Sequence, residues 1–309
     1  MGSQTPTREI TNVAVLDLTG YKSPEGLDGV TKIADVALVL VPESLLEKFM
    51  TIPQEHVAAT VPVPDGTHVK VITGQITMSG EALATAGGDS EACLVVMGQL
   101  LVTSLVEKVG YRGMVVMGQV FAPEGSESAL GAGLTRLMGE VIYYPQGSRI
   151  KSLGGQVKMG GEALANPAGD EKDILVVGGQ LLVTSPVAKV GYGQLIVAGQ
   201  MVAPRESENV LSPRLRVSGQ LLYYSGKPRF VVGDEHFGQA FFTFLKEPTT
   251  LVLIGDVTIE PGVTAELIQE KVSEIVLAGD LRAPKELVPL LQFLTVEKQG
   301  NIIAAGDEE

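Results

Sequence analysis

The sequence repeats itself over a long stretch. Residues 98–111 read GQLLVTSLVEKVGY and residues 179–192 read GQLLVTSPVAKVGY, so twelve of the fourteen positions match. The match continues from MVVMGQVFAP (114–123) to LIVAGQMVAP (195–204), and from RLMGEVIYY (136–144) to RVSGQLLYY (216–224). Two tandem copies of this kind predict an array of similar structural units that pack on one another.

A shorter period runs through both copies and beyond them. Within alternating apolar runs, a glycine followed by Gln, Glu or Asp recurs roughly every 20 residues from Gly74 to Gly279. Around Gly255, one parity holds Leu251, Leu253, Val257 and Ile259, and the other parity begins with Val252. Alternation with period two is typical of a β-strand, so each unit is predicted to be one strand and one return.

Energetics predict that such units are stable only when they are stacked. Four inward aliphatic side chains contribute about 6 to 10 kcal/mol, whereas ordering twenty residues costs on the order of 20 to 40 kcal/mol of backbone entropy. The expected fold is therefore mostly β: a single-chain repeat solenoid, either a β-helix or a leucine-rich-repeat-like stack of ~20-residue rungs. A few short helices are expected toward the C-terminus, at 262–274 and 285–294, and near residues 43–50.

The repeats define the expected domain organisation. Residues 1–68 form an N-terminal capping region continuous with the stack, 69–149 are solenoid repeat 1, and 150–229 are solenoid repeat 2. Residues 230–309 form a degenerate repeat 3 and a C-terminal cap. Because the glycine period crosses 149/150 without a linker, no break is predicted there.

Composition excludes several classes of function. The net charge of -13 over 309 residues argues against nucleic acid and against an anionic membrane as partners. Cys93 is the single cysteine, and the N-terminus lacks a signal-peptide pattern, which together favour a cytoplasmic location. The apolar run at 36–42 is far shorter than the roughly 20 residues that span a bilayer, so no membrane insertion is expected.

The glycines are interpreted as structural. A glycine on the inward face of each strand leaves room for a facing side chain or for close approach of another backbone. GAGLTR (131–136) lacks the third glycine of a dinucleotide fingerprint, so no cofactor is predicted. The structural glycines are Gly74, Gly98, Gly118, Gly139, Gly155, Gly179, Gly199, Gly219, Gly255 and Gly279.

Two series of side chains are predicted on the outward face. The polar series is interpreted as a ladder of stacked amides, with a ligand- or polymer-binding stripe as the alternative; it comprises Gln99, Gln119, Gln180, Gln200, Gln220, Asp256 and Asp280. The apolar series is predicted to be an assembly face that a second subunit covers, because monomers rarely expose such a stripe. It comprises Val95, Met97, Leu101, Val115, Met117, Phe121, Val176, Leu182, Ile196, Val202, Val252 and Ile254.

Few residues suggest catalysis or metal binding. His56, His68 and His236 lie far apart and lack ligand spacing. His236, beside Asp234 and Glu235, is interpreted as part of a solvated turn, and Cys93 as a small apolar residue. No catalytic, cofactor-binding or metal-binding residue is assigned, and the chain is predicted not to be an enzyme.

The VxGQL and VxGDL runs between about residues 69 and 284 resemble those of bacterial polymerising β-solenoids of the bactofilin-like class. The resemblance implies a cytoplasmic structural element and carries over no functional residue. The leading hypothesis is a non-enzymatic structural or scaffolding β-solenoid that self-associates into a homo-oligomer or filament, or assembles with a partner. The alternatives are a leucine-rich-repeat-like module that binds protein or glycan and, less favoured, a β-helix carbohydrate-active enzyme.

Overall fold

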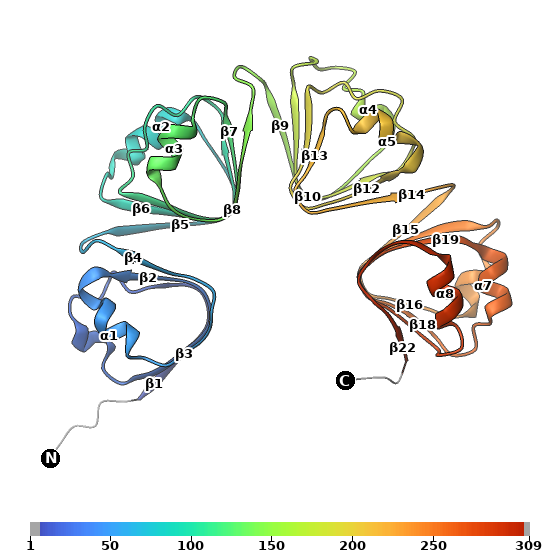
Figure 1. Ribbon diagram of the computed structural model, residues 1–309, viewed down its shortest axis with the longest axis horizontal. Coiled ribbons are helices and arrows are strands. Elements are labelled where there is room, and N and C mark those ends of the chain that lie inside the picture. Colours follow the sequence, from blue (N-terminus) through green and yellow to red (C-terminus); the bar gives the residue numbers. More distant parts are fainter. Residues whose placement is uncertain (1–6, 306–309) are drawn as a thin grey trace. The chain divides into compact units, whose positions relative to one another are not determined.

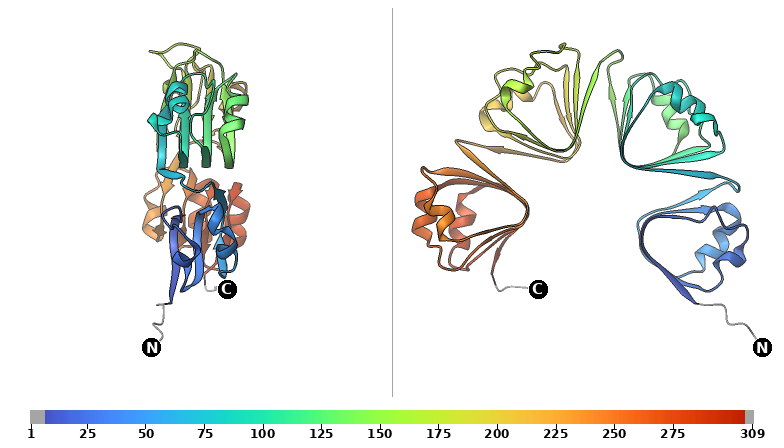
Figure 2. Two further views of the ribbon diagram at one scale, coloured as in Figure 1. Left: turned by 90° about the vertical axis from the view of Figure 1, so that its left-hand side faces the viewer. Right: turned by 180° about the vertical axis from the view of Figure 1, so that it is seen from behind.

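The computed structural model describes residues 7–305. Strands make up 49% of the chain and helices 19%, so the protein is mostly β, as predicted. The chain divides into two compact units, Met1–Gly147 and Ser148–Glu309. Every strand pair in the described residues is parallel, and each bent sheet is closed on its concave side by short helices (Figure 1 and, from behind, Figure 2). Within residues 7–305, no helix has the length and apolar character needed to cross a membrane.

The first unit begins with a sheet in which β2 pairs with the other three strands. Its core holds Leu27, Ile33, Leu45 and Phe49, each fully buried. The strands are β1 (Arg8–Asp17), β2 (Val30–Pro42), β3 (Gln54–Val57) and β4 (Thr60–Val63), and the helical turns are η1 (Pro24–Leu27), η2 (Glu43–Leu45) and α1 (Leu46–Met50).

The second sheet of this unit has the order β5-β6-β7-β8, with glycines aligned from strand to strand. Helix α2 begins where the Ser79 hydroxyl accepts a hydrogen bond from Ala82 N at 3.1 Å, which satisfies a free amide of the first turn. The elements are β5 (His68–Met78), α2 (Gly80–Thr85), η3 (Ala86–Gly88), β6 (Ala92–Val102), β7 (Gly113–Pro123), α3 (Glu127–Gly133) and β8 (Leu134–Tyr144).

The second unit begins with a sheet built on the same plan, in which β9 pairs with β10 and the later rungs are each split at a glycine. The split separates β11 from β12 at Gly199 and β13 from β14 at Gly219. The elements are β9 (Ile150–Met159), α4 (Gly161–Leu164), β10 (Ile174–Val183), β11 (Gln194–Val197), β12 (Gln200–Pro204), η4 (Arg205–Ser207), α5 (Glu208–Leu211), β13 (Leu215–Val217) and β14 (Gln220–Tyr224).

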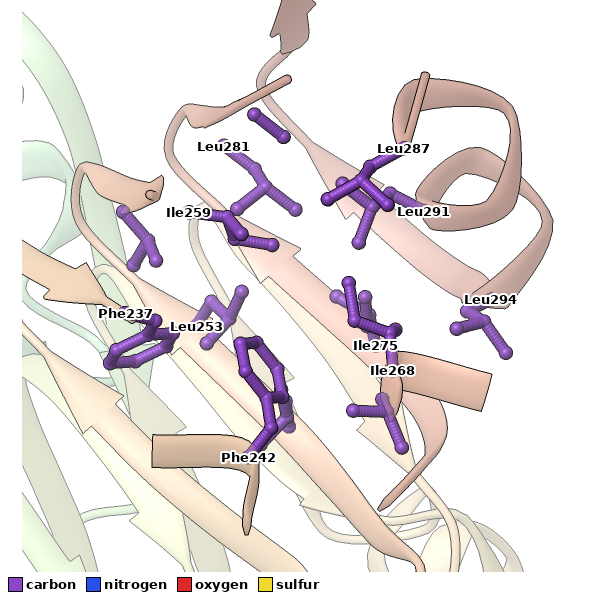
Figure 3. Packing of buried hydrophobic residues seen from close by; sticks show 14 of the residues in the cluster. Phe237, Phe242, Leu253, Ile259, Ile268, Ile275, Leu281, Leu287, Leu291 and Leu294 are labelled. Atoms are coloured by element: carbon purple, nitrogen blue, oxygen red, sulfur yellow. The ribbon is translucent and has the colours of Figure 1, made fainter. Parts of the chain in front are cut away.

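The rest of this unit holds two four-stranded sheets, β15-β17-β19-β21 and β16-β18-β20-β22. Helices α6, α7 and α8 contribute Phe242, Ile268 and Leu291 to the core between them, where Leu253 and Ile275 also pack (Figure 3). The elements are β15 (Pro228–Val232), β16 (Glu235–Phe237), α6 (Gln239–Thr243), β17 (Thr249–Ile254), β18 (Val257–Ile259), α7 (Ala265–Lys271), β19 (Val272–Ala278), β20 (Leu281–Ala283), α8 (Val288–Leu294), β21 (Thr295–Gln299) and β22 (Ile302–Ala304).

The predicted single-chain repeat solenoid is wrong. The chain forms several separate parallel sheets with helices interspersed along its length, an α/β-like arrangement. Strand pairing stops and restarts between β4 and β5, between β8 and β9, and between β14 and β15, so residues 8–63 form a sheet of their own. The absence of a break at 149/150 was also predicted incorrectly, since β8 and β9 belong to different sheets and to different units.

Both faces of several strands are buried, which explains their almost continuous apolar sequence. Leu251 and Leu253 pack in the core beneath the helices, whereas Val252 and Ile254, on the other face, pack against the sheet of β10 and β12. The alternation therefore separates two buried faces rather than a core from solvent.

Candidate functional site

Columns of glycines run across the strands at the bends. Gly98, Gly118, Gly139, Gly179, Gly199 and Gly219 have φ between +136° and +151°, a region that side chains with a Cβ rarely adopt. A Cβ at any of these positions would overlap the carbonyl oxygen of the glycine on the preceding strand. The glycines are therefore required by close backbone approach.

Two members of these columns are missing from the sequence-based set. Gly233 precedes Gly255, and Gly300 follows Gly279. Because β19 pairs with β21 with a shift in register, Gln299 lies opposite Ala278, and Gly300 continues the column. Gly233 precedes Asp234 and fits the repeating pattern of glycine followed by Gln, Glu or Asp, whereas Gly300 precedes Asn301 and does not.

Each column begins at a glycine that has no preceding strand beside it, so the space at its Cβ position is empty. At Gly74, Gly155 and Gly233, a Cβ would meet no atom within 4 Å, although φ is still between +74° and +101°. These glycines lie in or directly after the first strands of their sheets. In the described residues, the first strands are thus open on the side where each later strand has a predecessor.

The predicted amide ladder is a chain of hydrogen bonds between strands. The Gln99 amide donates to Gln119 at 3.3 Å, and Gln200 donates to Gln220 at 2.7 Å. Gln180 bridges Gln156 and Gln200. Asp256 and Asp280 make different contacts: Asp256 lies 3.8 Å from the Arg282 guanidinium, and Asp280 accepts a hydrogen bond from Asn301 N at 3.0 Å.

The predicted assembly face is buried. In the first unit, Val95, Met97, Val115 and Met117 lie in a cluster with Leu38 and other residues of the first sheet. In the second unit, Leu182, Val202, Val252 and Ile254 pack together between sheets. Leu101, Phe121, Val176 and Ile196 are each at most 4% exposed. The stripe is therefore not a free surface for a second subunit. The prediction was wrong because these strands are buried on both faces, whereas the apolar alternation was interpreted as that of strands buried on one face.

The sheet edges are the exposed parts of the same columns. Val71 on β5 is 44% exposed, whereas Val95, its neighbour on β6, is fully buried. Leu153 on β9 is 37% exposed, and its neighbour Val177 is fully buried. We call β5, β9 and β15 with β16 the first edges, and β8, β13 with β14, and β21 with β22 the last edges. Backbone amides and carbonyls on an outer edge strand can pair with another chain.

A groove of about 520 Å³ lies among the first edges of the second unit. Gln156 and Lys158 of β9 line it together with residues 229–232 of β15, 235–237 of β16 and Phe241 of α6. The rings of Phe237 and Phe241 stack at 3.8 Å, and the Arg229 guanidinium lies 5.4 Å from the Phe241 ring centre. The charged side chains of the lining are two cations, Lys158 and Arg229, and one carboxylate, Glu235.

The structure does not bring the three histidines together. His56 Nδ1 lies 3.0 Å from Asp35, His68 Nδ1 lies 3.4 Å from Asp89, and His236 lines the groove. Within residues 7–305, no group of three or more His, Cys, Asp and Glu side chains could hold a metal ion. Burial raises the pKa of the Cys93 thiol to about 11, which keeps it protonated and unreactive near neutrality.

Each repeat ends in a pair of tyrosines, and the second, buried tyrosine of each pair has a structural role. The Tyr224 hydroxyl donates to the Val183 carbonyl at 2.8 Å, and Tyr144 makes the equivalent bond to Val102. Burial raises the pKa of Tyr144 to about 12. Both hydroxyls link strands two rungs apart.

Comparison with protein-family models, with curated proteins and with solved structures finds no match to this chain.

Proposed function

We propose that the protein is a non-enzymatic structural scaffold whose copies associate head to tail, the first edges of one copy pairing with the last edges of another. The observation that carries this proposal is the empty space beside Gly74 and Gly155, where a Cβ would meet no atom within 4 Å. Every later glycine of these columns has the carbonyl of an identical glycine in that position. Pairing within the chain is thus a template for pairing between copies.

The side-chain columns support the same arrangement. One interior column of the second sheet runs Ile72, Val96, Val116 and Leu137, and another runs Ile76, Leu100, Val120 and Val141. Both columns begin and end with aliphatic residues, so strand β5 placed after strand β8 of another copy would continue them without a polar interruption.

Charge favours pairing between unlike edges. Strands β5 and β9 contain Lys70, Lys151 and Lys158 and no carboxylate, in a chain whose net charge is -13. The last strands carry charges of both signs, Glu140 and Glu297 together with Arg136, Arg216 and Lys298. Lysine on an edge strand disfavours pairing of like edges, so two lysine-bearing first edges repel each other more than a first edge and a last edge of mixed charge do.

Head-to-tail contacts are heterologous and generate filaments or rings rather than closed dimers. The resemblance of the VxGQL runs to bactofilin-like polymerising proteins supports assembly, although not the solenoid fold. A cytoplasmic location belongs to the same proposal and is supported by a lone buried cysteine.

The test replaces apolar residues on two first edges. Val71→Lys combined with Leu153→Lys places a charge on β5 and on β9, where a partner strand would cover it. Wild-type protein at micromolar concentration should sediment as species larger than one chain, and the double variant as a single chain. Micrographs of the wild type should show an axial repeat of about 19 Å, four strands at ~4.8 Å each.

Leu105→Lys is the matched control, because Leu105 is 39% exposed but lies outside the edges, in the return after β6. It should assemble as the wild type does. A wild-type protein that remains a single chain at tens of micromolar would refute the proposed function.

A further inference from the structure

Two facing columns cross the second unit between its sheets. One runs Lys158, Leu182, Val202 and Leu222 from β9 to β14. The column that faces it runs Phe230, Val252, Val276 and Glu297 from β15 to β21. The inner members of both columns pack in one cluster and are at most 2% exposed. A cation therefore stands at the first-edge end of this interface and a carboxylate at the last-edge end.

Lys158 lies in the groove without a carboxylate partner among the described residues. Arg229 lines the same groove and adds a second positive charge near the lysine, against the one carboxylate of Glu235, which favours an anionic partner. The groove thus combines a basic lining with the exposed start of an apolar interface.

At the last-edge end of this interface, an ion pair with Arg205 fixes the Glu297 side chain. Its Oε1 accepts from the Arg205 guanidinium, which lies 5.8 Å from the Tyr223 ring centre. The side chain of Glu297 remains 30% exposed beside Arg205. Held by Arg205, the carboxylate loses little conformational entropy on binding a second cation.

We infer that this groove is the docking site for the last edge of the second unit in another copy of the chain, with Lys158 paired to Glu297 of the partner subunit. This inference rests on the proposed function. It names the contact that would set the register between the edge strands of two copies. If the columns continue from copy to copy, Lys158 and the partner's Glu297 lie on the two facing sheets, which pack ~10 Å apart, and are offset along the stack by one strand spacing of ~4.8 Å.

The helices provide a second, independent observation. Phe242, Ile268 and Leu291 occupy equivalent buried positions on α6, α7 and α8. Two residues further on, α7 has the exposed Glu270, whereas the chain has Phe244 directly after α6 and Phe293 in α8, each 82% exposed. Large apolar side chains thus stand on the two outer helices and a charge on the middle one, as expected if the helix layers of successive copies meet.

The test exchanges the charges. Lys158→Glu alone and Glu297→Lys alone should each weaken association about tenfold or more, because like charges then face each other at every joint. An equimolar mixture of the two variants should assemble again, since each joint then pairs a glutamate with a lysine. Lys172→Glu, the same change in an exposed return between α4 and β10, should leave association unchanged.

The outcomes separate this inference from the proposed function. If the wild type assembles and neither single variant changes association, or if the mixture does not recover, the groove is not the docking site while the scaffold proposal stands. A single-chain wild type refutes both. Lys158-dependent binding of inorganic phosphate by a protein that stays a single chain would assign the groove to a small anion instead. Thermal melting of each variant verifies that it is folded.

Discussion

At the scale of single residues, backbone approach rather than side-chain chemistry constrains this protein most. Successive glycines stack with the carbonyl of one where the Cβ of the next would lie. Positive φ adds a second reason, since only glycine adopts these angles at low cost. Outside the columns, Gly80, Gly110, Gly161 and Gly191 likewise lie so close to a backbone carbonyl that a Cβ would overlap it.

Gly199→Ala should therefore destabilise the fold. Its φ is +151°, and the added Cβ would overlap the backbone of Gly179. We expect a loss of about 2 kcal/mol or more in the free energy of unfolding, measured by urea denaturation. Gly131→Ala is the control: it lies in α3 with no atom within 4 Å of its Cβ position, so it should be neutral or stabilising. Equal effects at both sites would contradict the close approach.

A buried polar cluster in the second repeat predicts a dependence of stability on pH. Asp173 is 3% exposed, and its carboxylate accepts hydrogen bonds from Asp170 N at 3.1 Å and from Asn166 at 3.3 Å, with Lys151 Nζ at 3.3 Å. Burial by itself would raise the pKa of Asp173, but these hydrogen bonds and the lysine outweigh it and lower the pKa. The resulting stabilisation is present above the unfolded-state pKa of about 4 and is lost as pH falls through the lower folded pKa.

Asp173→Asn should accordingly lower the free energy of unfolding at pH 7, and the difference from wild type should shrink below about pH 4. Denaturant titrations from pH 7 down to 3 measure it. Glu162→Gln, on the exposed face of α4, serves as the control and should follow the wild type throughout. A difference that does not change with pH would mean that the charge of Asp173 contributes nothing.

At the scale of elements, serines join the returns of neighbouring rungs. Ser126 and Ser207 are at most 1% exposed, and their hydroxyls accept from Val106 N at 3.1 Å and from Val187 N at 2.8 Å. Both bonds join residues that lie one rung apart in the sequence. The short helices are thus held by the preceding return as well as by their own turns.

Ser207→Ala should leave the Val187 amide buried without a partner. We expect a loss of about 1 to 3 kcal/mol in the free energy of unfolding. Hydrogen exchange should show faster exchange at Val187 than in the wild type. Ser212→Ala removes an exposed hydroxyl that donates to the Glu208 carbonyl and should cost much less. Unchanged protection at Val187 would show that another group satisfies the amide.

The spacing of the glycines in the sequence also marks where one sheet ends and the next begins. The glycine steps from Gly139 to Gly155 and from Gly219 to Gly233 are shorter than every step between glycines of one sheet. A short step leaves no room for a return with a helix, so the chain starts a new sheet. Averaged with the other steps into one period of roughly 20 residues, these two short steps no longer mark the breaks between sheets.

At the scale of the whole molecule, the covered apolar stripe and the open edges have opposite consequences. Because the outward faces of these sheets are buried, the edges are the part of the sheets that is left for association. The four later sheets are each four strands deep, and the first is three. Edge pairing in the second unit would continue both of its facing columns at once, which gives the joint one register.

The sequence by itself determined that strands recur at a regular spacing, that glycines mark their bends and that alternate side chains lie on opposite faces, because these are local consequences of strand geometry. Only the tertiary structure decided what covers the second face and where pairing restarts. Val252 has the same alternation whether solvent, a partner or another sheet lies opposite it. Burial on that face depends on residues far away in the sequence, such as Leu182, and a period-two pattern carries no information about such a neighbour.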